Sequence, residues 1–197
     1  RVGYWRLHAR DEPPALKKDR PDIYVDLSAI AKGYGVDQLA ALASAAGFND
    51  YLVSIGGEVQ ARGHNGKGQP WTIAVEQPVP GQRAVERLIR LGDHSISTSG
   101  DYRNFFEQDG RRYSHIINPR TGRPVPQTVA SVTVISNQSA QADATATALM
   151  AAGPEFGFRL ATEHHLAAFF ILVSANGAFQ ERYTPEFEPY FLPQPPP

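Results

Sequence analysis

Apolar positions recur along the chain with two periods, and together they predict a succession of helices and strands. Small and apolar residues at helical spacing predict three helices, over 31–47, 139–153 and 154–165. Gly47 and Gly153 are expected to stop the first two helices, and Ser139 is a candidate cap for the second.

Alternation with period two predicts the strands, which fall largely into hairpins. Segments with strand character cover 22–30 (a strand running into a turn), 49–57, 70–78, 84–92, short pieces of 94–119 around Asp109-Gly110, 130–136, and a closing hairpin over 166–183. Antiparallel hairpins interrupted by helices indicate the α+β class, with a mixed or antiparallel sheet and helices packed on one face. No long linker divides the chain, so one domain is expected over 1–197, with a proline-rich tail at 193–197.

Composition narrows the function classes. The net charge is −1, with 19 Lys+Arg against 20 Asp+Glu, and nothing suggests a nucleic-acid surface or a basic membrane helix. No apolar run approaches the roughly 18 residues that span a bilayer. The absence of cysteine excludes disulfides, thiolate zinc sites and a cysteine nucleophile.

The segment VDLSAIAKGYGVD, at 25–37, is the first candidate for chemistry. Asp26 leads into a turn of small residues, and a helix opens near Lys32. A helix N-terminus beside a lysine suits a phosphate group. The segment is neither a P-loop nor a GxGxxG motif. The alternative is a helix start packed closely against a sheet, with Gly33 and Gly35 allowing the approach.

The segment ADATATAL is the second candidate. Asp143 and Thr147 stand at i and i+4 of the predicted helix, so their side chains point the same way. A carboxylate and a hydroxyl are hard oxygen ligands that suit magnesium. The alternative is a polar helix face in which Thr147 bonds back to its own turn.

The segment STSGD, at 97–101, predicts a small polar turn between two apolar runs. Backbone amides of such a turn can bind a ligand, which makes Ser99 and Gly100 candidates for cofactor binding. The alternative is a plain loop.

The segment RYSHIINP contains the best candidate for proton transfer, His115. An extended strand would place Tyr113, His115 and Ile117 on one face, before a turn at NPRTG. No GxSxG or HExxH motif supports a hydrolase triad or a zinc peptidase. Without its context, the pattern favours a packed strand residue at His115 over a base.

The four segments resemble, in order and in approximate spacing, one family, the ApbE flavin transferases (FAD:protein FMN transferases). The matching stretches are VDLSAIAKGYGVD, YLVSIGGEVQARG, STSGDYRNFFEQDGRRYSHIINPRTGRPV and ASVTVIS…ADATATALMAAG. The resemblance implies an α+β, T-fold-type domain. It also implies that FAD is cleaved with magnesium, that FMN is transferred to a Thr or Ser hydroxyl of an acceptor protein, and that AMP is released.

The resemblance also assigns roles to residues of this chain. Asp143, Thr147 and the carbonyl of Ala29 would hold magnesium. Asp26, Lys32 and Ile117 would contact FAD, and His115 would take the proton from the acceptor hydroxyl.

The family's acceptors include subunits of membrane redox complexes that carry the motif Asp-x-x-[Ser/Thr]-Gly-Ala-Thr, and many members are lipoproteins. The resemblance therefore implies a bacterial periplasmic location with an inner-membrane anchor in a full-length form. This chain is expected to lack the family's N-terminal segment. Asn118 replaces a usual Asp, and Thr145 a usual Leu. A FAD pyrophosphatase, a non-catalytic FAD carrier on the same fold and a scaffold domain are the alternatives.

Overall fold

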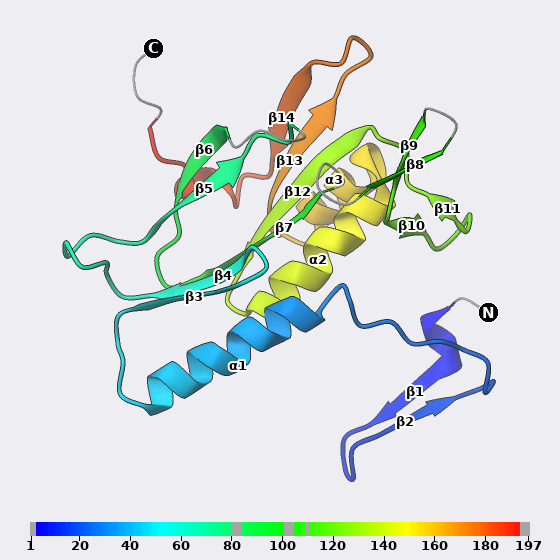
Figure 1. Cartoon of the computed structure of the whole chain (residues 1–197), viewed down its shortest axis with the longest axis horizontal. Helices are drawn as coiled ribbons and strands as arrows, with labels where there is room; N and C mark the ends of the chain where they lie inside the picture. Colours follow the sequence, from blue (N-terminus) through cyan, green and yellow to red (C-terminus); the bar gives the residue numbers. More distant parts are fainter. Residues whose placement is uncertain (1–2, 80–83, 101–104, 109–110, 194–197) are drawn as a thin grey trace.

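A computed structural model describes residues 3–79, 84–100, 105–108 and 111–193 of the chain. Its centre is a six-stranded sheet in the order β14-β13-β12-β7-β4-β3, in which every neighbouring pair is antiparallel (Figure 1). The strands are β3 (Tyr51–Ile55), β4 (Glu58–Arg62), β7 (Ser95–Gly100), β12 (Val129–Ser136), β13 (Ala167–Val173) and β14 (Phe179–Tyr183).

Three helices cover one face of this sheet, as Figure 1 shows: α1 (Ala31–Ala45), α2 (Ser139–Ala152) and α3 (Pro154–Glu163). Val132 and Val134 of the central strand β12 pack with Ala142 and Ala146 of α2 in one buried cluster. Alanine on the inner face of α2 brings the helix close to the sheet. The strand is buried on both faces because the opposite face of the sheet is covered too.

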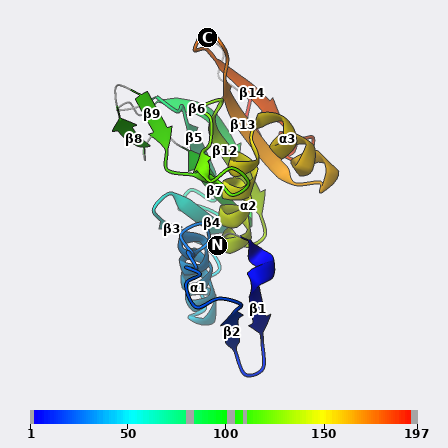
Figure 2. The ribbon, with the colours of Figure 1, turned by 90° about the vertical axis from the view of Figure 1, so that its right-hand side faces the viewer.

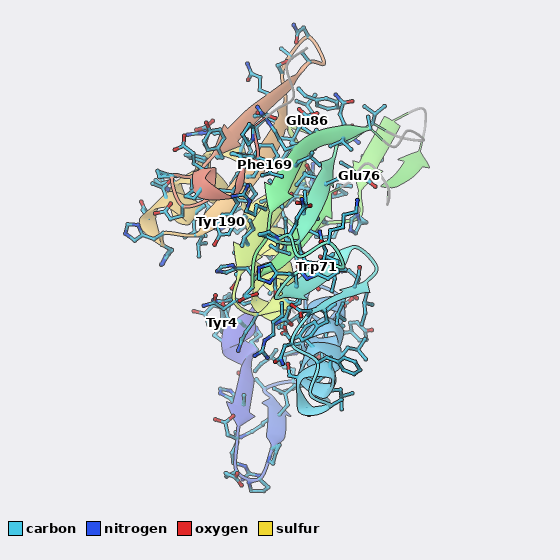
Figure 3. All side chains as sticks on the ribbon, turned by 90° about the vertical axis from the view of Figure 1, so that its left-hand side faces the viewer. Tyr4, Trp71, Glu76, Glu86, Phe169 and Tyr190 are labelled. Carbon is cyan, nitrogen blue, oxygen red and sulfur yellow. The ribbon has the colours of Figure 1, made fainter. Side chains whose placement is uncertain are left out.

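The opposite face carries the hairpin of β5 (Thr72–Glu76) and β6 (Val85–Arg90), together with the C-terminal segment that contains η2 (Glu188–Tyr190). Phe169 of β13 stacks on Phe187 with ring centroids 5.5 Å apart, and Phe191 packs edge-on against Phe169. Figure 3 labels Phe169 and Tyr190 on this side of the sheet. The aromatic cluster therefore joins the hairpin to the sheet.

Three further hairpins complete the described structure. They are β1 (Leu7–Arg10) with β2 (Ala15–Lys18), β8 (Phe105–Gln108) with β9 (Arg111–Ser114), and β10 (Ile117–Asn118) with β11 (Arg123–Pro124). The short helix η1 (Tyr4–Arg6) precedes β1. Figures 1 and 2 both show the β1–β2 hairpin projecting from the body, and its residues are largely exposed.

The predicted α+β class, the helices on one face and the hairpins at 70–92 and 166–183 are confirmed. Gly47, with φ of 87°, follows the end of α1, and Gly153 caps α2. Of the described helices, none is long and apolar enough to cross a membrane.

Three local predictions are wrong. Residues 22–30 form no strand, because no strand of the described sheet pairs with them. Ser97–Gly100 belong to β7 rather than to a turn, because β12 pairs with them along their whole length. Ser139 is the first helical residue of α2, and Asp37 of α1 accepts its N–H at 2.7 Å instead of a local cap.

The predicted strand around His115 is interrupted. β9 ends at Ser114 and β10 begins at Ile117, because the chain turns from one hairpin into the next. The alternation of faces nevertheless holds, with Ser114 and Ile116 buried and His115 and Ile117 exposed. Asp101, the Asp109-Gly110 turn and the tail beyond Pro193 lie outside the described residues.

Candidate active site

A cavity of about 850 Å³ opens where the start of α1, the strands β4 and β7, the hairpin strand β5 and the β9–β10 junction meet. This volume lies within the range of small-molecule sites. Eight of the nine predicted site residues line it: Asp26, Ala29, Lys32, Ser99, Gly100, His115, Ile117 and Thr147. Their convergence on one cavity is a structural observation, whereas their individual roles stay predictions.

The entry into α1 supplies one wall. The Asp26 carboxylate accepts the backbone N–H of Ser28 at 2.7 Å, which closes a local turn before the helix. Hydrogen bonds from Ser28 hold the pKa of Asp26 below its ordinary value, so this exposed carboxylate is charged. The turn brings Ala29 to the cavity wall.

Lys32, Glu58 and Asp143 form a charged cluster at that wall. The Lys32 ammonium lies 3.2 Å from Glu58 Oε1 and 3.4 Å from Asp143 Oδ1. Burial lowers the pKa of Lys32, but the charges of Glu58 and Asp143 outweigh it, and the pKa lies above the ordinary value. The side chain therefore carries a positive charge at neutral pH.

Asp143 is the ninth predicted site residue and lies behind Lys32, only 2% exposed. Its Oδ2 accepts the backbone N–H of Gly33 at 2.9 Å, at the positive N-terminus of α1. Gly33 is required here, because a Cβ at this position would lie 2.6 Å from the carbonyl carbon of Ser139. The close contact of α1 with α2 thus joins Lys32 to Asp143 across 111 positions of sequence.

The α2 side chains fit a magnesium ion in their chemistry. Asp143 offers a carboxylate, Thr147 one turn later a hydroxyl, and Ala29 a backbone carbonyl, which are the hard oxygen donors that magnesium prefers. Within the described residues, no group of three His, Cys, Asp or Glu could hold a metal. Further ligands would therefore have to be water or substrate phosphate.

Thr147 also connects α2 to the strand floor. Its Oγ1 lies 2.8 Å from Ser99 Oγ of β7. Thr98, the next residue back, bonds through its hydroxyl to Thr133 of β12 at 2.9 Å. The hydroxyls of Thr98 and Ser99 thus find partners on the neighbouring strand and helix, whereas the buried hydroxyls of Ser95 and Ser97 in the same strand have none in the described part of the chain.

His115 and Ile117 lie on the exposed side of the β9–β10 junction and face the cavity. The turn after them is held by Asn118, whose Oδ1 accepts the N–H of Arg120 at 2.9 Å and whose carbonyl accepts that of Gly122 at 2.8 Å. The NPRTG turn thus fixes the direction in which the His115 strand ends. Asp in place of Asn118 would accept the same hydrogen bond.

Sequence reasoning missed two parts of the cavity. The first is an apolar wall from β5, where Ile73, Ala74 and Val75 face the site across the sheet. The second is Glu58, 3% exposed, at the start of β4. A lone acidic residue after the Gly56-Gly57 pair in an apolar run was the available signal for Glu58.

Fold and cavity define an α+β domain with one large site that combines a charged cluster, a histidine and an apolar wall. A family model described as the ApbE family matches residues 1–170. The chain therefore belongs to the ApbE family.

Individual relatives agree with this assignment. The FAD:protein FMN transferase of Vibrio cholerae serotype O1 is 47% identical over 183 residues, covering 93% of this chain and 54% of that protein. The protein of the same name from Escherichia coli K12 is 42% identical over 177 residues, covering 90% and 50%. The chain thus spans about half the length of the curated relatives that it matches.

Solved structures agree as well. The flavin transferase ApbE from Vibrio cholerae superimposes with a TM-score of 0.85 at 44% identity, covering 95% of this chain and 59% of that one. The apo form of the Pseudomonas stutzeri flavinyl transferase ApbE gives 0.82 at 40% identity, covering 96% and 57%.

Proposed function

We propose that this protein transfers FMN from FAD to a Thr or Ser hydroxyl of an acceptor protein, with magnesium, and releases AMP. The observation that carries the proposal is the meeting of His115, Lys32 and the Asp143–Thr147 pair around one cavity. The relatives named FAD:protein FMN transferase, which match about nine-tenths of this chain, support the transfer of FMN from FAD to a protein.

The reaction requires a base for the acceptor hydroxyl and positive charge near the phosphates of FAD. The acceptor hydroxyl oxygen bonds to the flavin-side phosphorus, the bond from that phosphorus to the bridging oxygen breaks, and AMP leaves with the bridging oxygen. His115 takes the hydroxyl proton, because a neutral hydroxyl is a weak nucleophile. Lys32 stabilises negative charge on the phosphates.

Magnesium bound by Asp143, Thr147 and the Ala29 carbonyl would neutralise phosphate charge during transfer. The apolar β5 wall and Ile117 suit an aromatic ring system, and Lys32 together with a magnesium ion on Asp143 would suit a diphosphate. Asp26, Ser99 and Gly100 also line the cavity and would contact FAD.

Hydrolysis of FAD to FMN and AMP is the second candidate, because His115 is exposed and would deprotonate a water molecule as readily. Acceptors with the motif Asp-x-x-[Ser/Thr]-Gly-Ala-Thr and a periplasmic, membrane-anchored location are proposals that rest on the family alone. Cell fractionation tests the location.

Chromatography of FAD incubated with the protein, magnesium and an acceptor protein that carries the motif tests whether there is any reaction. We expect AMP to form only when both magnesium and the protein are present, and Asp143→Asn to abolish it. FAD that is bound but unchanged would contradict the proposal and indicate a carrier.

A further inference from the structure

Glu58 is a buried charge with an unusual set of partners. It begins β4 directly after the Gly56-Gly57 turn, where φ is 60° and 105°, values that favour glycine. A Cβ at Gly56 would lie 3.1 Å from Lys32 Cδ. The glycine pair therefore leaves room for the Lys32 stem, and Glu58 meets its charged end.

The second carboxylate oxygen of Glu58 bonds to a backbone N–H of the neighbouring strand β7. The β4–β7 ladder ends at Val59 and Ile96. Beyond that pair, Glu58 Oε2 accepts the backbone N–H of Thr98 at 3.3 Å. The carboxylate is thus fixed between the sheet and Lys32 at the point where the two strands part and the cavity opens.

One ammonium is shared by two carboxylates in this arrangement. Lys32 lies 3.2 Å from Glu58 and 3.4 Å from Asp143, so neither carboxylate holds it alone. If the Glu58 charge were removed, Coulomb attraction would draw the ammonium toward Asp143. An ammonium paired fully with Asp143 would compete with any cation for the same oxygens.

We propose that Glu58 is a positioning residue that holds Lys32 off Asp143, and so keeps the Asp143 carboxylate available to a divalent cation. The proposal rests on the proposed function, because it assumes that Asp143 and Thr147 hold a metal. The Glu58 carboxylate would thus act on the metal site through Lys32, without binding the metal itself.

Metal affinity in the absence of FAD tests this role. Mn²⁺ shares the oxygen preference of Mg²⁺ and is followed by electron paramagnetic resonance. We expect Glu58→Gln to weaken Mn²⁺ binding about 10-fold or more, the usual effect of losing an outer partner of a metal ligand. Glu58→Asp keeps the charge and should lie between wild type and Glu58→Gln. Glu86→Gln on β6, outside the cavity lining, is the matched control and should bind as wild type does.

A double-mutant cycle separates positioning from a general electrostatic effect. If Glu58 acts through Lys32, adding Glu58→Gln to Lys32→Gln should change Mn²⁺ affinity less than twofold. Equal weakening in both backgrounds, or no weakening in the single variant, overturns the inference.

The melting temperature of Glu58→Gln is measured beside its Mn²⁺ affinity, so that weaker binding by a folded variant is distinguished from loss of the fold. Wild-type protein that binds no Mn²⁺ overturns the metal part of the proposed function and this inference together. Wild type that binds Mn²⁺ while Glu58→Gln binds equally well overturns the inference alone.

Discussion

Two carboxylates at this site are buried although burial disfavours their charged form. Glu58 and Asp143 are both almost fully buried, yet each needs a counter-charge or an N–H donor to remain ionised. Lys32, the Thr98 amide and the Gly33 amide supply those partners. Sequence spacing identified Asp143 and Thr147 because they share one helix, but it missed Glu58, whose partners come from α1 and β7.

The pKa of Glu58 makes a prediction about stability. Burial, and then the charge of Asp143, raise this pKa above 4.5, against the effect of Lys32. The folded state therefore binds a proton more tightly than the unfolded state, and wild type loses stability as the pH rises from about 4.5 through the folded pKa. Urea titrations at several pH values should show that the unfolding free energy of Glu58→Gln, minus that of wild type, increases as the pH rises over that window. A difference that decreases there would contradict a raised pKa for Glu58.

His115 makes a prediction about rate. General-base help is typically worth about 10²–10⁴-fold, so His115→Ala should slow FMN transfer by that order while FAD binding is retained. Single-turnover kinetics and flavin fluorescence measure the two quantities. His165→Ala, at the end of α3 and paired with Glu186, is the control. A variant that transfers FMN at the wild-type rate would exclude His115 as the base.

At the scale of elements, the sequence predicted what local periodicity controls. The helices have apolar spacing and glycine stops, and the β5–β6 and β13–β14 hairpins alternate clearly. Ser97–Gly100 of β7 were predicted as a turn because serine, threonine and glycine favour turns locally, whereas pairing with β12 decides the outcome in the folded chain. The 22–30 segment has strand-like residues but no described strand beside it.

The close crossing of α1 and α2 should make the protein's stability sensitive to substitution of Gly33. Gly33→Ala would place a methyl group against the backbone of Ser139, so the helices must move apart at a cost of about 1–3 kcal/mol. Gly35→Ala meets only the Ile55 Cδ1 atom, at 2.9 Å, which can rotate away. Denaturant unfolding should therefore rank Gly33→Ala well below Gly35→Ala. The reverse order would contradict the close contact.

At the scale of the whole molecule, the cavity lies where the helices, the central sheet and the β5–β6 hairpin meet. The helices supply Lys32 and Asp143, the sheet supplies Glu58 and the residues of β7, and the β5–β6 hairpin supplies the apolar wall. Lys32 and Asp143 are 111 positions apart, and no spacing rule predicts such a pair. The family resemblance predicted that both residues belong to the site, and the fold shows how α1 and α2 bring them together.

The aromatic cluster behind the hairpin makes a prediction at this scale. Phe187 is fully buried against Phe169, and Leu192 N–H bonds to the Leu88 carbonyl at 2.9 Å, which ties the C-terminal segment to β6. Phe187→Ala should cost about 3–5 kcal/mol of unfolding free energy. It should also weaken FAD binding, because the β5 wall loses its support. Calorimetric melting and flavin titration measure both effects, and unchanged FAD affinity would show that the wall is held by other contacts.

We propose that the cavity carries out transfer rather than hydrolysis or storage. Intact mass spectrometry of an acceptor protein bearing the motif, mixed with this protein, FAD and magnesium, tests it most directly. We expect one FMN adduct on each acceptor and an equal amount of AMP, both absent without magnesium. AMP without an adduct, or bound FAD with neither product, would contradict it.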